Sequence, residues 1–107
     1  MASKRDSEDR DEAEELDFVW YPPKAVANLK KHGVSFEEAK TIFGDKKHIV
    51  VPDREHSYYE ERSLAIGRSV EGRVLIMCFT ARESRIRIIS ARLVGPWERR
   101  EYEIANE

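Results

Sequence analysis

The stretch from residue 62 to residue 92 constrains the fold most, because strand-forming residues run through it with only two short interruptions. Residues 62–70 and 73–80 are separated by a Glu-Gly pair, which suits the tight turn of a hairpin. The third run, residues 85–92, begins with alternating arginine and isoleucine, so one face of that strand is apolar and the other is charged. The sequence therefore predicts an antiparallel meander.

The residues before this meander have a helical period. Residues 23–32 are expected to form a helix, with Pro23 in its first turn and Gly33 ending it in a left-handed conformation. Val26 and Leu29 fall on one side of this helix and are expected to be its buried face.

A second helix is expected directly after the first. Ser35 and Glu38 have the spacing of a capping box, in which each side chain bonds the backbone N–H of the other residue. This helix is expected to end before Gly44 and to bury Phe36, Ala39, Ile42 and Phe43. The other expected elements are short strands at residues 18–20 and 48–51 and a last helix at residues 97–105.

These elements predict an α+β fold, with two N-terminal helices packed on a mainly antiparallel sheet and a C-terminal helix. With 107 residues, the chain is too short for two cores, so residues 18–107 are expected to form a single domain. Residues 1–17 have a net charge of −5 and no apolar face, and we expect a disordered acidic extension there. The remaining 90 residues then carry +3, against −2 for the whole chain.

Several classes of protein are disfavoured by what the sequence lacks. A single cysteine, Cys78, can form neither an internal disulfide nor a cysteine-based metal site, and it suits a reducing cytoplasm. No apolar run approaches the roughly 18 residues that would span a membrane. No glycine-rich phosphate loop or zinc spacing is present, so we expect neither a cofactor nor a bound metal.

The charge pattern favours a polyanionic ligand. Residues 82–100 contain six arginines and two glutamates, a local charge of +4. RNA can be cleaved without a metal, because its 2′-hydroxyl attacks the adjacent phosphate once a base removes the proton and cations stabilise the developing charge.

Two groups of residues could do this chemistry. Lys24 and His32 lie on the first helix and can flank one surface, although a histidine at that position is equally suited to capping the helix. The second group lies at strand ends and in loops of the meander and consists of Arg62, Arg68, Arg82 and Arg92. Neighbouring strands there are close enough for side chains to converge on one phosphate. Each of these arginines could instead be solvated or paired with Glu60, Glu61 or Glu83.

Six strings of residues form a recognisable pattern. The most specific are Lys-His-Gly-Val-x-Phe-Glu-Glu-Ala at residues 31–39 and Arg-Ile-Ile-Ser-Ala-Arg at residues 87–92. The others are Trp20-Tyr21-Pro22-Pro23-Lys24, Asp53 with His56, Glu60-Glu61-Arg62 and Thr80-Ala81-Arg82, together with Asn28-Leu29-Lys30 before the first string. In order and at matching spacing, these strings resemble the BrnT family of toxins over residues 18–103.

The resemblance implies a RelE/ParE-like fold and the toxin of a type II toxin-antitoxin system, an endoribonuclease that arrests translation. It implies a BrnA antitoxin with a ribbon-helix-helix module, so that DNA is contacted only through the antitoxin, and a dimer or a 2:2 complex is compatible with it. On the matching positions, the family's catalytic set falls on Lys24, His32, Glu61, Arg62, Arg82 and Arg92. Arg68, Arg85 and Arg87 are expected to contact RNA, although Arg85 and Arg87 could instead be solvated or face a partner.

The chain departs from the family pattern at three places. Tyr21 stands where an aspartate usually caps the first helix, Leu93 replaces a second arginine, and Gly95-Pro96 replaces a threonine cap. Two other functions therefore stay open at this point: a ParE-like toxin that blocks a protein target without cleaving RNA, and an inactive scaffold that only binds the antitoxin.

Overall fold

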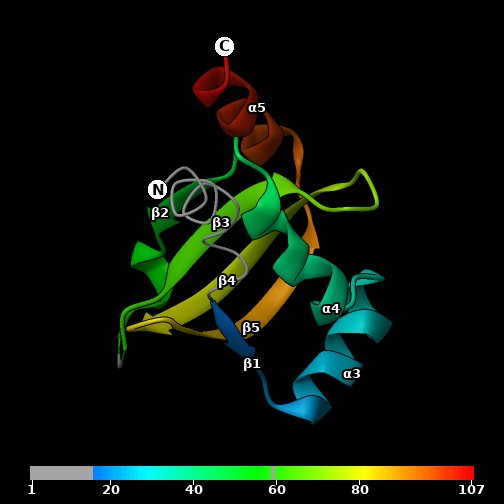
Figure 1. The fold of residues 1–107 in the computed structure, drawn as a ribbon, viewed down its shortest axis with the longest axis vertical. Coiled ribbons are helices and arrows are strands. Elements are labelled where there is room, and N and C mark those ends of the chain that lie inside the picture. Colours follow the sequence, from blue (N-terminus) through cyan, green and yellow to red (C-terminus); the bar gives the residue numbers. More distant parts are fainter. Residues whose placement is uncertain (1–15, 59) are drawn as a thin grey trace, which may run out of the picture.

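The computed structural model of the chain describes residues 16–58 and 60–107, so residues 1–15 of the predicted acidic extension lie outside it. Five strands form one sheet in the order β1-β5-β4-β3-β2 (Figure 1). The strands are β1 (Asp17–Val19), β2 (Ile49–Pro52), β3 (Ser63–Arg68), β4 (Val74–Arg82) and β5 (Arg85–Leu93). The helices are α3 (Pro22–His32), α4 (Phe36–Ala39) and α5 (Pro96–Ala105), with 3-10 turns η1 (Lys40–Gly44) and η2 (Arg54–His56).

The sheet contains the predicted meander, and the α+β class is confirmed. β2, β3, β4 and β5 pair antiparallel in that order, while β1 pairs parallel with β5. β1 begins at Asp17, one residue before the expected strand and inside the segment predicted to be a disordered extension. No helix in the described part of the chain is long and apolar enough to cross a membrane.

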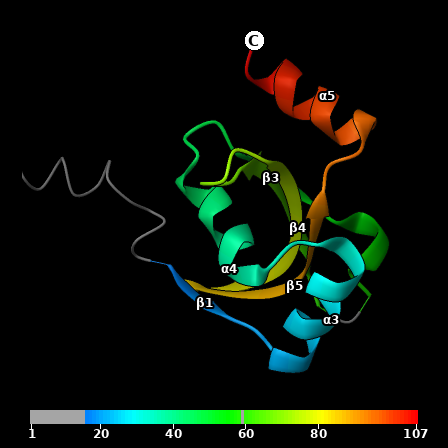
Figure 2. The same ribbon diagram turned by 90° about the vertical axis from the view of Figure 1, so that its right-hand side faces the viewer.

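The two faces of the sheet are covered differently. α4 lies in the concave side of the curved sheet and α5 extends beyond one end of it (Figure 2). The main core lies between α3, α4, η1 and the sheet, and its largest fully buried side chains include Phe36, Ile42, Leu75, Met77 and Ile88. A smaller cluster on the other face joins Tyr102 of α5 to Ile66, Val74 and Ile76.

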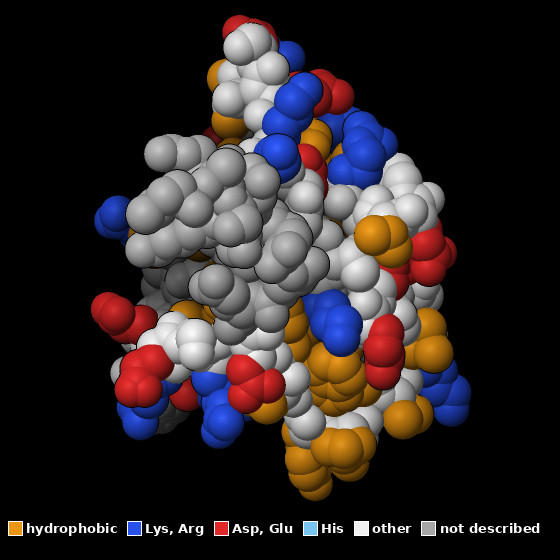
Figure 3. Space-filling view, viewed as in Figure 1, with side chains coloured by type: hydrophobic (Ala, Val, Ile, Leu, Met, Phe, Trp, Pro, Cys, Tyr) orange, Lys and Arg blue, Asp and Glu red, His pale blue; other side chains and the backbone are white. Residues whose placement is uncertain are grey.

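The orientation of α3 differs from the prediction. Gly33 ends the helix as expected, with φ at +69° and its N–H bonded to the carbonyl of Leu29. The expected buried face was wrong, because Val26 and Leu29 are 68% and 52% exposed and Asn28 is buried instead. Hydrophobic side chains accordingly gather on the surface at the end of the molecule formed by the β1–α3 connection and α3 (Figure 3).

Asn28 is buried because its side-chain amide replaces a neighbouring strand. Beyond the short β1, the outer edge of β5 has no strand partner in the described sheet. The Asn28 amide accepts from the N–H of Ala91 at 3.1 Å and donates to the Ala91 carbonyl at 2.7 Å, and it also donates to the carbonyl of Val34. This pairing satisfies backbone groups that would otherwise be buried without partners.

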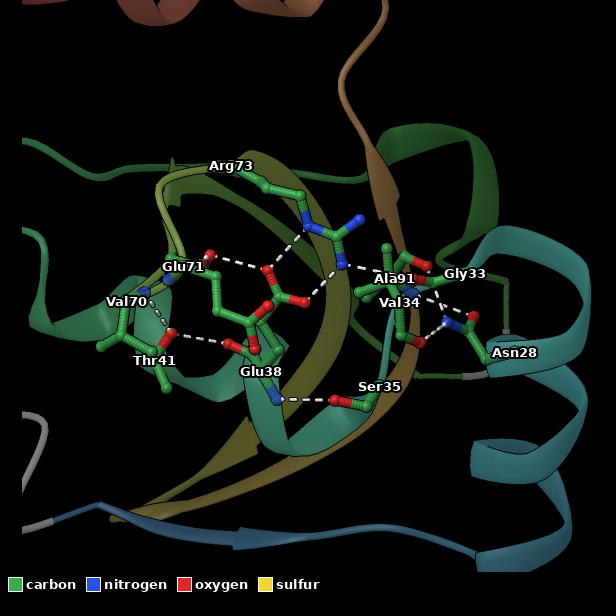
Figure 4. Close-up of polar contacts among 11 residues, drawn as sticks. Asn28, Gly33, Val34, Ser35, Glu38, Thr41, Val70, Glu71, Arg73 and Ala91 are labelled. Atoms are coloured by element: carbon green, nitrogen blue, oxygen red, sulfur yellow. Dashed lines mark hydrogen bonds and ion pairs between the residues drawn. The ribbon is translucent and has the colours of Figure 1, made fainter.

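The capping box at the start of α4 is only half formed. The Ser35 hydroxyl accepts from the N–H of Glu38 at 3.0 Å, as predicted. The reciprocal bond was a wrong prediction, because the Glu38 carboxylate is 6% exposed and bonds Arg73 and Ser69 of the β3–β4 hairpin instead (Figure 4). The predicted second helix also tightens after Ala39 into the 3-10 turn η1, which still buries Ile42.

Candidate functional site

A bulge in β5 determines which side chains line the open face of the sheet. Phe79 of β4 pairs with Ile88, but Cys78 pairs with Ser90, so Ile89 is an extra residue in β5. Ile86 and Ile88 face the main core before the bulge, and Ala91 faces it afterwards. Ser90 and Arg92 consequently share the opposite face with Cys78 and Ile76.

A cavity of about 220 Å³ opens on this face. Strands β3, β4 and β5 form its floor, and the loop that contains η2 forms one wall. It brings together two of the predicted arginines, an imidazole and a carboxylate, and it is lined by Asp53, His56, Arg62, Leu64, Ile76, Cys78, Ile89, Ser90 and Arg92.

The imidazole and the carboxylate are in direct contact. Nδ1 of His56 lies 3.1 Å from both carboxylate oxygens of Asp53. The Asp53 side chain is 7% exposed, whereas that of His56 is 60% exposed. A histidine whose Nδ1–H donates to a buried carboxylate keeps Nε2 as an acceptor, so this pair can present a base to a ligand in the cavity.

Cys78 contributes a thiol and not a thiolate. Its Sγ donates to Oδ2 of Asp53 at 3.5 Å. Burial and the neighbouring carboxylate raise the pKa of the Cys78 thiol to about 11. Because thiolates and not thiols are good nucleophiles, Cys78 is unsuited to nucleophilic attack near neutral pH.

The two arginines in the cavity differ in how they are paired. Arg92 forms a bidentate pair with Glu98 at 2.9 and 2.7 Å, and these hydrogen bonds raise the pKa of Arg92 and lower the pKa of Glu98. Arg62 lies 3.7 Å from Glu60, and its Nε is buried without a hydrogen-bond partner among the described residues. Leaving a buried donor without a hydrogen bond costs roughly 1–3 kcal/mol, and an anion that accepted from this Nε–H would recover that cost.

A neighbouring cavity of about 520 Å³ holds other predicted residues. Glu61, Arg82, Arg85 and Arg87 line it, together with Glu60 and residues of β1 and β4. Arg85 and Arg87 point away from the core, as their alternation with isoleucine predicted. Arg85 pairs with Asp17 at 3.1 Å and Arg87 pairs with Glu60 at 2.7 Å, so carboxylates offset much of the local positive charge.

Three predicted residues lie away from both cavities. Arg68 is exposed at the end of β3 and donates to the carbonyl of Gly72. Lys24 and His32 lie one helical turn on either side of Asn28, and so on the side of α3 that faces the edge of β5. The structure thus brings together Arg62 and Arg92 but adds neither the α3 residues nor Arg68 and Arg82 to their cavity.

The His56–Asp53 pair was not among the site residues predicted from the sequence. Both residues belong to the strings that resemble the BrnT family, and that was the available signal. Their spacing of three residues predicts no contact by itself, because the contact depends on the 3-10 turn η2. Asp53 also accepts a hydrogen bond from Cys78, a residue 25 positions later in the chain.

Fold and cavity together define a small α+β protein with a cavity on the open face of its sheet that holds two arginines, a histidine and a carboxylate. The family model described as "Ribonuclease toxin, BrnT, of type II toxin-antitoxin system" matches residues 20–98, and the chain therefore belongs to this family. The crystal structure of the Brucella abortus ribonuclease toxin BrnT has a similar fold, with a TM-score of 0.59 and 23% sequence identity over 75% of this chain and 97% of that chain. No curated protein sequence matches the chain.

Proposed function

We propose that this toxin is a metal-independent endoribonuclease whose reaction takes place in the cavity of His56, Arg62 and Arg92. The observation that carries the proposal is the buried Nε–H of Arg62, which has no hydrogen-bond partner in the part of the chain that the structure describes, lies 3.7 Å from Glu60 and lines the same cavity as the His56–Asp53 pair. A phosphate oxygen would satisfy this donor, and a base beside a bound phosphate is the arrangement that cleavage through the 2′-hydroxyl requires.

In the proposed reaction, Nε2 of His56 takes the proton of the 2′-hydroxyl. The 2′ oxygen forms a bond to phosphorus, the bond from phosphorus to the 5′ oxygen breaks, and the leaving oxygen takes a proton from solvent. The products are a 2′,3′-cyclic phosphate and a 5′-hydroxyl end. Arg62 and Arg92 donate hydrogen bonds to the phosphate oxygens, and Asp53 orients the imidazole and stabilises its charged form.

The other residues expected from the sequence also enter this proposal. Glu61 and Arg82, which were predicted to be catalytic, line the neighbouring cavity; Arg82 is suited to bind a phosphate beside the cleaved bond, and Glu61 stays a candidate for catalysis. Lys24 and His32 stay candidates for catalysis, and a direct comparison with His56 tests them. Arg68, Arg85 and Arg87 are proposed to contact RNA, with the pairs Arg85–Asp17 and Arg87–Glu60 opening when the strand binds.

The test compares two matched histidine variants in an RNA cleavage assay with EDTA present. His56→Gln is expected to slow cleavage by roughly 10²–10⁴-fold, the range for loss of a general base. His32→Gln tests the alternative base on α3, and the proposal expects this variant to retain activity because Nε2 of His56 is the base. Arg62→Gln is expected to lose roughly 10²–10³-fold, with Arg99→Gln on the exposed side of α5 as its control.

Each outcome has a clear consequence. Full activity of His56→Gln would refute His56 as the base, and loss of activity in His32→Gln alone would place the base on α3. Loss of wild-type activity in EDTA would refute the metal-independent mechanism. Intact RNA together with arrested DNA replication after induction would favour a ParE-like toxin, and absence of toxicity without the antitoxin would favour an inactive scaffold.

We further propose that the fold is related to the RelE and ParE toxins and that RNA cleavage arrests translation. We propose a BrnA-like antitoxin with a ribbon-helix-helix module as the neutralising partner. Membership in a type II toxin family and the small α+β domain support these statements. Sequencing of the adjoining reading frame and a pulse-labelling measurement of protein synthesis after induction test them.

A further inference from the structure

We infer that Glu98 of α5 is a positioning residue of the active site: it holds the Arg92 guanidinium so that one edge of that group faces the cavity and binds a phosphate. The inference rests on the proposed function, because it concerns how one of the two cavity arginines contacts the RNA. β5 leads directly into α5 at one end of the sheet (Figure 2). Of the described residues, Arg92 lines the cavity and Glu98 does not, so a helix outside the cavity orients a side chain inside it.

The hydrogen bonds of Arg92 leave one edge of its guanidinium open. Nη1 donates to Oε1 of Glu98 at 2.9 Å and to the Leu93 carbonyl at 3.1 Å, and Nη2 donates to Oε2 of Glu98 at 2.7 Å. In the described part of the chain, Nε–H and the second Nη2–H of Arg92 have no acceptor. These two N–H groups are parallel on the same edge of the planar group, and such a fork matches two oxygens of a phosphate.

Glu98 is itself held in place by the fold. Its Oε1 also accepts from the N–H of Gly95 at 2.8 Å, and its side chain is 19% exposed. Tyr102, one turn later on the same side of α5, packs in the smaller core cluster and donates to Oδ2 of Asp45 at 2.6 Å. A carboxylate on an anchored helix therefore restricts an arginine side chain that would otherwise sample many rotamers, so the guanidinium is oriented before the RNA binds.

This pair differs from the ion pair of the neighbouring cavity. Arg87 and Glu60 both line that cavity, so the carboxylate lies where a phosphate would bind. Glu98 contacts Arg92 from outside its cavity and leaves the phosphate position open. Its negative charge still repels a nearby phosphate. Glu98 is accordingly expected to raise the rate of the chemical step through orientation and not to tighten the binding of RNA.

The kinetic experiment measures kcat and KM of the full chain for RNA cleavage. Glu98→Gln retains an oxygen that accepts from Gly95, but it loses the charge and one of the two bonds to Arg92. It is expected to lower kcat roughly tenfold with an unchanged or lower KM. Glu101→Gln, which changes an exposed carboxylate of the same helix, is the matched control and should retain both constants.

A double-variant comparison separates positioning from a general effect on α5. In an Arg92→Gln background, Glu98→Gln should change kcat by less than about twofold, because Glu98 acts through Arg92. An effect on the stability of the helix alone would lower kcat equally in both backgrounds.

Nuclear magnetic resonance of the arginine Nε–H groups tests the geometry without cleavage, with inorganic phosphate as the probe. In the wild type, phosphate is expected to shift the Nε–H signals of both Arg62 and Arg92. In Glu98→Gln, the Arg92 shift should be lost, whereas the Arg62 shift should remain.

The outcomes separate this inference from the proposed function. Equal phosphate shifts of Arg92 in the wild type and in Glu98→Gln, or an unchanged kcat in that variant, would overturn the inference and leave the proposed function standing. A loss of kcat that persists undiminished in the Arg92→Gln background would also overturn it. Absence of phosphate shifts at both arginines in the wild type, together with full activity of Arg92→Gln, would refute the proposed function as well.

Discussion

Replacement of Glu38 by glutamine tests the polar network that fastens α4 to the β3–β4 hairpin. The Glu38 carboxylate accepts from Ser69 Oγ at 2.7 Å, from Arg73 Nε at 3.0 Å and also from Arg73 Nη2. Breaking a fully buried ion pair costs about 3–5 kcal/mol. The Arg73 side chain is 36% exposed and can be hydrated in the variant, so Glu38→Gln is expected to lower the free energy of unfolding by about 2 kcal/mol.

The effect of pH distinguishes loss of the charge from loss of packing. Hydrogen bonds from Arg73 lower the pKa of Glu38, although burial opposes them. A carboxyl group with a depressed folded-state pKa stabilises the fold fully above its unfolded pKa of about 4.3, and the stabilisation is lost as the pH falls through the folded value. The difference in the free energy of unfolding between wild type and Glu38→Gln should therefore be largest near pH 7 and shrink below about pH 4.

Urea unfolding monitored by circular dichroism at pH 7 and at pH 3 measures the difference in unfolding free energy and its dependence on pH. Asp17→Asn is the control, because the Asp17–Arg85 pair is 56% and 67% exposed and its loss should cost less than about 0.5 kcal/mol. A difference in unfolding free energy between wild type and Glu38→Gln under about 0.5 kcal/mol at pH 7, or one of equal size at both pH values, would refute the reasoning.

Three further predictions concern single residues. Cys78 should react with iodoacetamide at pH 7.5 at least tenfold more slowly than a free thiol, because burial keeps its pKa near 11; rapid alkylation of the folded protein would contradict this. Asn28→Ala should lower the free energy of unfolding by about 2–3 kcal/mol and speed hydrogen exchange at the Ala91 amide, and unchanged exchange would argue against the edge pairing. Gly67→Ala should destabilise by about 1–3 kcal/mol in urea unfolding, since its Cβ would lie 3.1 Å from the backbone oxygen of Ile42; a neutral result would show that η1 shifts easily.

Most of the sheet could be predicted from the sequence, because its strands and turns are specified by residues that are close together in the chain. Alternation in Arg85-Ile86-Arg87-Ile88 and the Glu-Gly turn between β3 and β4 follow from strand geometry alone. The orientation of α3 could not be predicted in this way. Val26 and Leu29 are the most apolar residues of the helix, yet the bonds of Asn28 to β5 turn them towards solvent.

The site was predictable only as a set of charges. The sequence gives the arginines, and it leaves open whether each binds a ligand or a carboxylate. That choice depends on contacts such as Arg87 with Glu60, which lies 27 residues earlier in the chain. The His56–Asp53 pair depends on a 3-10 turn of three residues, too short to have a recognisable period.

The bulge at Ile89 connects the fold to the site. Strict alternation along β5 would continue from Ile86 and Ile88 to Ser90 and Arg92, so that a hydroxyl and a guanidinium would enter the main core. An unpaired charge in a core is too costly for a small domain to retain. The extra residue reverses the alternation, which places Ala91 in the core and Arg92 in the cavity beside Arg62. The cavity therefore exists because one residue of β5 has no partner in β4, a feature of strand pairing that the sequence of either strand alone does not reveal.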